Sequence, residues 1–135
     1  MSQIKVNFLF VRREDTLVVR IENPCAKTLQ FADTIYYNKP EMPGFIGFNF
    51  TTDQRPEQSG FKYPLMNKAF RLGFPRMLPL KPDQNIKKRI YIKPLFDNLK
   101  EPGETLTSFQ IRITLFFNNY LSDKKNFFSP VYELS

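Results

Sequence analysis

The most chemically suggestive stretch of the sequence is a run of cations and isoleucines from residue 85 to residue 93. If this run is a β-strand, alternate side chains point to opposite faces. One face then carries Lys87, Arg89, Tyr91 and Lys93, and the other carries Ile86, Ile90 and Ile92. Three cations beside an aromatic ring can contact anionic groups while the ring packs or stacks. Arg76 and Lys81 come shortly before the run and extend the predicted basic patch.

The same cations have a simpler interpretation. Lysines on an edge strand discourage pairing with another chain, and a basic surface keeps a small domain dispersed. The formal net charge of +7 fits both this interpretation and an anionic partner such as nucleic acid or an acidic protein.

Aromatic residues supply a second set of candidate contacts. The sequence contains 15 Phe and 6 Tyr but no Trp. Neighbouring aromatic residues in a strand point to opposite faces, so Tyr36, Phe116 and either Phe127 or Phe128 are candidates for an exposed position. The irregular segment from Phe61 to Arg76 is the alternative cover for them.

The residue types in the sequence give little indication of a catalytic site. The absence of His removes the commonest general base and metal ligand. The single cysteine, Cys25, is predicted to be a small buried residue at a strand end. Asp53 and Glu57 share a polar loop and are predicted to be solvated carboxylates rather than cation ligands. We therefore predict no catalytic residue, no metal site and no cofactor.

The secondary-structure elements that position these side chains are predicted to be short antiparallel strands. Hydrophobic side chains alternate with polar ones, and 11 prolines leave little room for a long helix. Residues 53–60 form a predicted exposed loop, Glu101–Glu104 a type II turn, and Gly47 a bulge. A single helical turn is expected around Leu65–Phe70. The predicted strands are Ile4–Phe10, Leu17–Glu22, Thr28–Tyr37, Phe45–Thr52, Ile86–Ile92, Ser108–Asn118 and Phe127–Leu134.

This arrangement predicts an all-β fold, a single antiparallel immunoglobulin-like β-sandwich of about seven to eight strands over residues 1–135. Three segments resemble bacterial immunoglobulin-like domains: Leu17–Pro24, Leu78–Ile92 with its Leu80-Lys81-Pro82-Asp83-Gln84 turn, and Ser108–Phe117. The resemblance implies a fold and carries no functional residues across. The paired cysteines and core tryptophan of antibody domains are absent.

The functional expectation is a non-enzymatic protein-binding module, such as an assembly component, an adaptor or an immunity-type or inhibitor-type partner. Its partner is expected to be acidic. A nucleic-acid or polyanion binder is the alternative, and a carbohydrate-active enzyme with two distant carboxylates is the outsider. No apolar stretch is long enough to span a bilayer, and no signal peptide precedes the first strand. The chain as written is expected in the cytoplasm, or in the periplasm or outside the cell if it is a mature form with an added Met.

Overall fold

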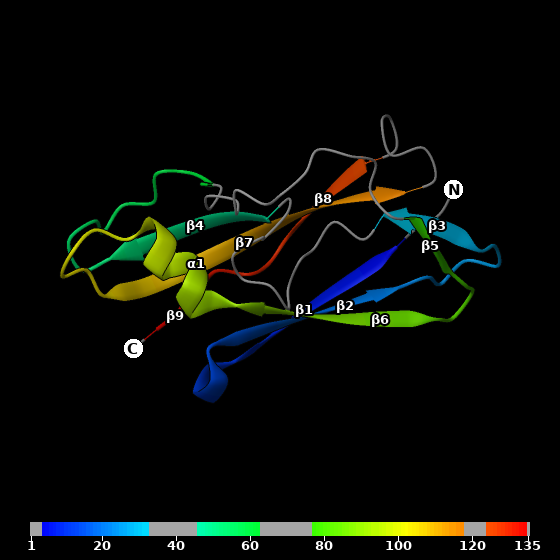
Figure 1. Ribbon diagram of the computed structural model, residues 1–135, viewed down its shortest axis with the longest axis horizontal. Coiled ribbons are helices and arrows are strands. Elements are labelled where there is room, and N and C mark those ends of the chain that lie inside the picture. Colours follow the sequence, from blue (N-terminus) through cyan, green and yellow to red (C-terminus); the bar gives the residue numbers. More distant parts are fainter. Residues whose placement is uncertain (1–3, 33–45, 63–76, 118–123, 135) are drawn as a thin grey trace.

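The computed structural model describes residues 4–32, 46–62, 77–117 and 124–134, and Figure 1 shows their arrangement. The elements are β1 (Lys5–Val11), η1 (Arg12–Glu14), β2 (Thr16–Glu22), β3 (Leu29–Ala32), β4 (Ile46–Thr52), β5 (Met77–Leu80), β6 (Asn85–Tyr91), α1 (Ile92–Leu99), β7 (Leu106–Phe117), β8 (Lys124–Phe128) and β9 (Tyr132–Glu133). Every strand pairing is antiparallel, which confirms the all-β, antiparallel prediction, with nine strands in these ranges.

The strands form two sheets that lie against each other (Figure 1). The smaller sheet has the order β1-β2-β6. The larger one has the order β4-β7-β3-β5, with β8 and β9 also paired to β7. The long strand β7 holds the larger sheet together because it pairs with β3, β4, β8 and β9.

Inward-facing side chains of both sheets form one buried cluster. Phe48 stacks on Phe50 and on Phe109, with ring centroids 5.3 and 5.8 Å apart. The alternation predicted for β7 is confirmed, since Phe109, Ile111, Ile113, Leu115 and Phe117 are all buried. Burial of this much aromatic and β-branched surface is the main force that holds the two sheets together.

One element differs in kind from the prediction. Ile92, expected on a strand that Pro94 ends, begins the helix α1. Pro94 is tolerated there because the first turn of a helix has no internal partner for its missing N–H. Ile92, Leu95 and Phe96 are buried, and these positions share one helical face. The helical period was hidden by the proline, which had been interpreted as a strand terminator.

The loops follow the predictions more closely. Residues 53–60 are exposed apart from the half-buried Arg55. Glu104 N donates to Glu101 O, and Gly103 has a φ of 81°, as a type II turn requires. The bulge predicted at Gly47 is wrong, because the register of β4 shifts instead between Thr51 and Thr52. The segment Leu65–Phe70 lies outside the described residues.

Asn23 joins the two sheets at one end of the molecule. It is fully buried, and its Nδ2 donates to Leu80 O of β5 and to Lys27 O, at 2.9 and 2.8 Å. Its backbone also bonds to Asp83 and Gln84 in the turn before β6. The Asn-Pro strand end and the Leu80–Gln84 turn, two features behind the sequence resemblance, are therefore in direct contact. Among the described helices, none is long and apolar enough to cross a membrane.

Candidate binding surface

The outer face of the three-stranded sheet gathers the predicted basic strand together with two strands from the N-terminal hairpin. We call it the basic face. Its solvent-facing side chains are Lys5, Asn7, Leu9, Val11, Val18, Arg20, Glu22, Asn85, Lys87, Arg89 and Tyr91. Side chains directly opposite each other on adjacent strands lie close together, so the register defines rows across the sheet.

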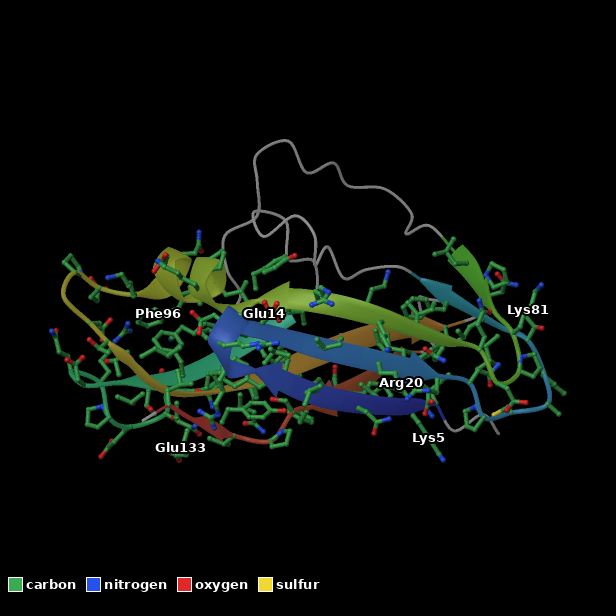
Figure 2. The ribbon with its side chains drawn as sticks, turned by 90° about the horizontal axis from the view of Figure 1, so that it is seen from below. Lys5, Glu14, Arg20, Lys81, Phe96 and Glu133 are labelled. Atoms are coloured by element: carbon green, nitrogen blue, oxygen red, sulfur yellow. The ribbon has the colours of Figure 1, made fainter. Side chains whose placement is uncertain are left out.

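Two rows at the centre of the basic face combine charge and apolar surface. One row runs Asn7, Arg20, Lys87, and the next runs Leu9, Val18, Arg89. Leu9 is 63% exposed and lies directly opposite the half-buried Val18, so the centre of the face presents apolar surface beside its cations. Figure 2 views this sheet from outside, with Lys5 and Arg20 on its surface.

The charges of the basic face are unbalanced. Among the described residues it carries four cations, Lys5, Arg20, Lys87 and Arg89, against one carboxylate, Glu22. Arg20 Nη2 lies 2.8 Å from Glu22 Oε1. Arg20 and Lys87 are direct cross-strand neighbours, and like charges in that position destabilise a sheet. An anionic partner would relieve this repulsion.

Lys93 was predicted on the strand with Lys87 and Arg89, and this placement is wrong. The strand ends at Tyr91, so Lys93 lies in the first turn of α1. Its Nζ lies 2.8 Å from Asp97 Oδ2, and this hydrogen bond raises the pKa of Lys93. Lys93 therefore belongs to a helical ion pair rather than to the basic face.

The inward face of β6 carries a lysine among its isoleucines. Lys88 is buried, with 4% of its surface exposed, and shares the inward face with Ile86 and Ile90. Strict alternation predicts that position, but a lysine there runs against the usual preference for solvent.

The other predicted contact residues do not join the basic face. Lys81 is exposed in the turn between β5 and β6, beyond the end of the strands (Figure 2), where its N–H donates to Gln84 Oε1. Tyr36 and Arg76 lie outside the described residues. Phe116 is part of β7, and its side chain is also outside the described set.

Leu9 and Arg20 complete the basic face but were absent from the predicted site. A signal existed, because alternation already placed both of them on the outward phase of the N-terminal hairpin. Their neighbourhood to Lys87 depends on the pairing of β2 with β6, which are separated by more than sixty residues in the chain. Local patterns carry no information about such a pairing.

A hollow of about 380 Å³ bounds the basic face at its Tyr91 end, lined by Glu14, Asp15, Tyr91, Lys93 and Pro94. The two carboxylates make this end less cationic than the central rows. An acidic ligand is therefore favoured over the part of the face between Lys5 and Arg89.

A buried carboxylate, Glu104, forms an ion pair with Arg55 away from the basic face. The Glu104 carboxylate has a 1% exposed side chain and accepts from Arg55 Nε at 2.7 Å and from Arg55 Nη2 at 2.5 Å. Thr52 Oγ1 and the Glu101 N–H also donate to it, at 2.5 and 2.6 Å. These bonds, chiefly those from Arg55, lower the pKa of Glu104 to about 2. We call this group the Glu104 clamp.

The remaining chemical candidates do not assemble into a site. Asp53 is exposed and its Oδ1 accepts from Thr105 N, while Glu57 is exposed in the same loop. Cys25 is half-buried rather than buried, and its N–H donates to Asn23 Oδ1. No group of three His, Cys, Asp or Glu residues that could hold a metal ion occurs within the described ranges.

Comparisons with known proteins do not add an identity. No protein-family model, no curated protein and no solved structure matches this chain. A functional interpretation therefore depends on the geometry and charge of its surfaces.

Proposed function

We propose that this chain is a non-enzymatic binding module that recognises an acidic protein through the basic face. The observation that carries the proposal is the register of β1, β2 and β6. It sets the exposed Leu9 beside Val18 and Arg89, and sets Arg20 and Lys87 in the adjacent row. Apolar contact supplies affinity, and the surrounding cations steer and orient an acidic partner.

The mixture of side chains favours a protein over nucleic acid. A surface for single-stranded nucleic acid combines cations with several aromatic rings on which successive bases stack. Among the described residues, the basic face has one aromatic ring, Tyr91, at its edge, and aliphatic Leu9 and Val18 at its centre. Aliphatic groups add nothing to phosphate binding but pack well against apolar side chains of a protein.

The immunoglobulin-like relationship belongs to the same proposal. It is supported by the hydrogen bonds that join Asn23 to Leu80 and to the following turn. An antiparallel sandwich is a suitable scaffold for a binding surface, because rigid strands fix the side chains in their rows.

The test compares two charge-reversal variants of equal net charge. Lys87→Glu with Arg89→Glu changes the basic face, whereas Lys27→Glu with Lys62→Glu changes exposed lysines elsewhere. Each substitution alters the charge by −2, so both variants go from +7 to +3. The probes are fluorescent 20-residue peptides of Glu alone or of Glu with Leu and Phe, and a single-stranded 20-nucleotide DNA, followed by anisotropy.

We expect the peptide with Leu and Phe to bind most tightly. The K87E/R89E variant should lose about tenfold or more in affinity for it, and K27E/K62E should lose much less. Tighter binding of DNA than of either peptide would instead support the nucleic-acid alternative. Equal losses in both variants would mean that only net charge matters, and the proposal would fail.

A further inference from the structure

The two edge strands on one side of the sandwich leave their inward side chains incompletely covered. Ten apolar residues pack against the core while only half-buried, and seven of them come from β1, β8, β9 and the residues next to them. These seven, which we call the apolar seam, are Ile4, Val6, Phe8, Phe10, Phe127, Tyr132 and Leu134. In contrast, Leu17, Val19 and Ile21 on the neighbouring β2 are fully buried.

The apolar seam is bridged at one end by side chains. The Phe10 and Tyr132 rings are 5.3 Å apart, and Arg12 Nη1 donates to Glu133 O at 2.6 Å. No backbone pairing between β1 and β9 is present in the described chain, where β1 pairs with β2 and β9 pairs with β7. The two sheets therefore meet along this side without being joined into one.

Strand β1 has the features of an edge that can accept another strand. All seven of its residues pair with β2 without a register shift, so the strand is regular along its whole length. Edge strands are normally protected by lysines and other charges, by prolines or by bulges. β1 has no proline and no bulge, and its one charged residue, Lys5, is its first residue, so Val6–Val11 carries none of these features. On the facing edge of the larger sheet, Pro130 separates β8 from β9, so that edge is interrupted.

A pocket lies where the apolar seam reaches the end of the sandwich. Its volume is about 200 Å³, and its apolar walls come from Phe10, Ile92, Phe96, Leu106 and Leu134. This space suits one large apolar side chain at the end of an added strand.

We propose that the β1 edge accepts an extended segment of the protein partner as a fourth strand of the three-stranded sheet. The segment alternates apolar side chains, which cover the apolar seam, with acidic side chains on the basic face beside Lys5 and Leu9. Main-chain hydrogen bonds supply affinity, and alternate side chains supply specificity. This inference rests on the proposed function and specifies how the acidic partner binds.

A second copy of this chain is a poorer occupant of the same edge. Antiparallel pairing of β1 with itself over its full length would set Lys5 of one copy opposite Val11 of the other, so that Lys5 meets no carboxylate, and each chain carries +7. The net charges of the two copies repel each other. The charge pattern therefore selects an acidic segment.

The test uses a nine-residue peptide in which Glu alternates with Val and Phe, and two N-methylated versions of it. In one version the backbone nitrogens of the Glu residues are methylated. In the other version the backbone nitrogens of the Val and Phe residues are methylated. Amides of alternate residues in a strand point to opposite edges, so only one set can bond to β1. We expect one methylated peptide to bind about as well as the parent and the other to bind about tenfold or more weakly.

Hydrogen exchange measured by NMR supplies the second readout. Alternate amides of β1 should exchange quickly in the free protein and become protected when the parent peptide binds, while the amides of β2 stay unchanged. Equal affinities of the two methylated peptides, or unchanged exchange in β1, would overturn the added strand.

The outcomes separate this inference from the proposed function. If K87E/R89E weakens peptide binding but methylation has the same effect in both versions, the basic face binds by side chains alone. If one methylated peptide fails while K87E/R89E binds normally, the edge is used but the basic face is not.

Discussion

The outward side of β4 in the larger sheet and the basic face of the smaller sheet differ in how much of their surface is exposed to solvent. On the larger sheet, all seven residues of β4 are buried. Ile46, Phe48 and Phe50 face the core, and residues that follow β4 contact its outward side. Asn49 Nδ2 donates to Gln58 Oε1 on the outward side of β4, and Lys62 forms an antiparallel bridge with Phe48 along the edge of β4. The basic face of the smaller sheet has exposed side chains on all three strands.

The segment after β4, residues 53–62, is held against β4 at both of its ends. At the start, the Glu104 clamp fixes Arg55, whose guanidinium also lies 5.0 Å from the Phe50 ring centroid. At the far end, Phe61 lies over Gly47, in a space that a larger residue would fill. A face that its own chain covers becomes part of the stable structure. A face left open with apolar side chains is available to a partner.

Removing the hydroxyl of Thr52 should give the largest loss of stability. Thr52 is buried, and its Oγ1 donates to Glu104 while it accepts from the backbone N–H groups of Gln54 and Arg55. Thr52→Val keeps the shape but removes one donor to Glu104 and the acceptor of the Gln54 and Arg55 N–H groups, which should lower the free energy of unfolding by about 2–3 kcal/mol. Urea denaturation measures the loss. Thr52→Ser, which keeps the hydroxyl, should recover most of it, and equal losses in the two variants would contradict the role of the bond.

The Glu104 clamp should also make the free energy of unfolding fall at acid pH. This is the second largest effect on stability that we expect. The pKa of Glu104 falls from an ordinary 4.5 to about 2 on folding. The contribution of the carboxylate is therefore complete above pH 4.5 and is lost as the pH falls toward 2. Glu104→Gln removes this contribution, so the variant should be less stable than the wild type at pH 7. Urea midpoints should converge as the pH approaches 2, and a gap that stays constant would argue against the clamp.

How far the sequence could predict these features depends on the distance between partners along the chain. Alternation predicted β7 correctly because Phe109 to Phe117 is a purely local pattern. The helix α1 was missed because Pro94 is compatible with both a strand end and a first helical turn. The Glu104 clamp was also missed, since Arg55 and Glu104 are joined only by the pairing of β4 with β7. Only the Lys87 to Tyr91 part of the basic face was predicted, for the same reason.

Truncating Phe61, which lies over Gly47, should lower the free energy of unfolding by a smaller amount. The Phe61 ring lies 5.6 Å from the Phe128 ring and 5.1 Å from the guanidinium of Arg112. Phe61 is half-buried, so Phe61→Ala should cost about 1–2 kcal/mol, less than truncation of a fully buried phenylalanine. Phe61→Leu is the matched control, because it keeps apolar cover and loses only the ring contacts with Arg112 and Phe128. Thermal unfolding should rank wild type, F61L and F61A in descending order, and an F61A protein as stable as wild type would show that the segment after β4 is not held there.

The smallest effect on stability is expected on the open face, at Leu9. Its side chain is 63% exposed, so Leu9→Ser removes little buried surface and should change the free energy of unfolding by less than about 0.5 kcal/mol. The same substitution removes the central apolar contact of the basic face. It should lower the affinity for the peptide of Glu, Leu and Phe by about tenfold. Val19→Ser is the contrasting variant, because Val19 is fully buried on the adjacent strand and its loss should unfold the domain more readily. If L9S destabilised the fold as V19S does, Leu9 would be a structural residue of the hairpin. A stable L9S protein that no longer binds the peptide is the result that separates an open face from a covered one.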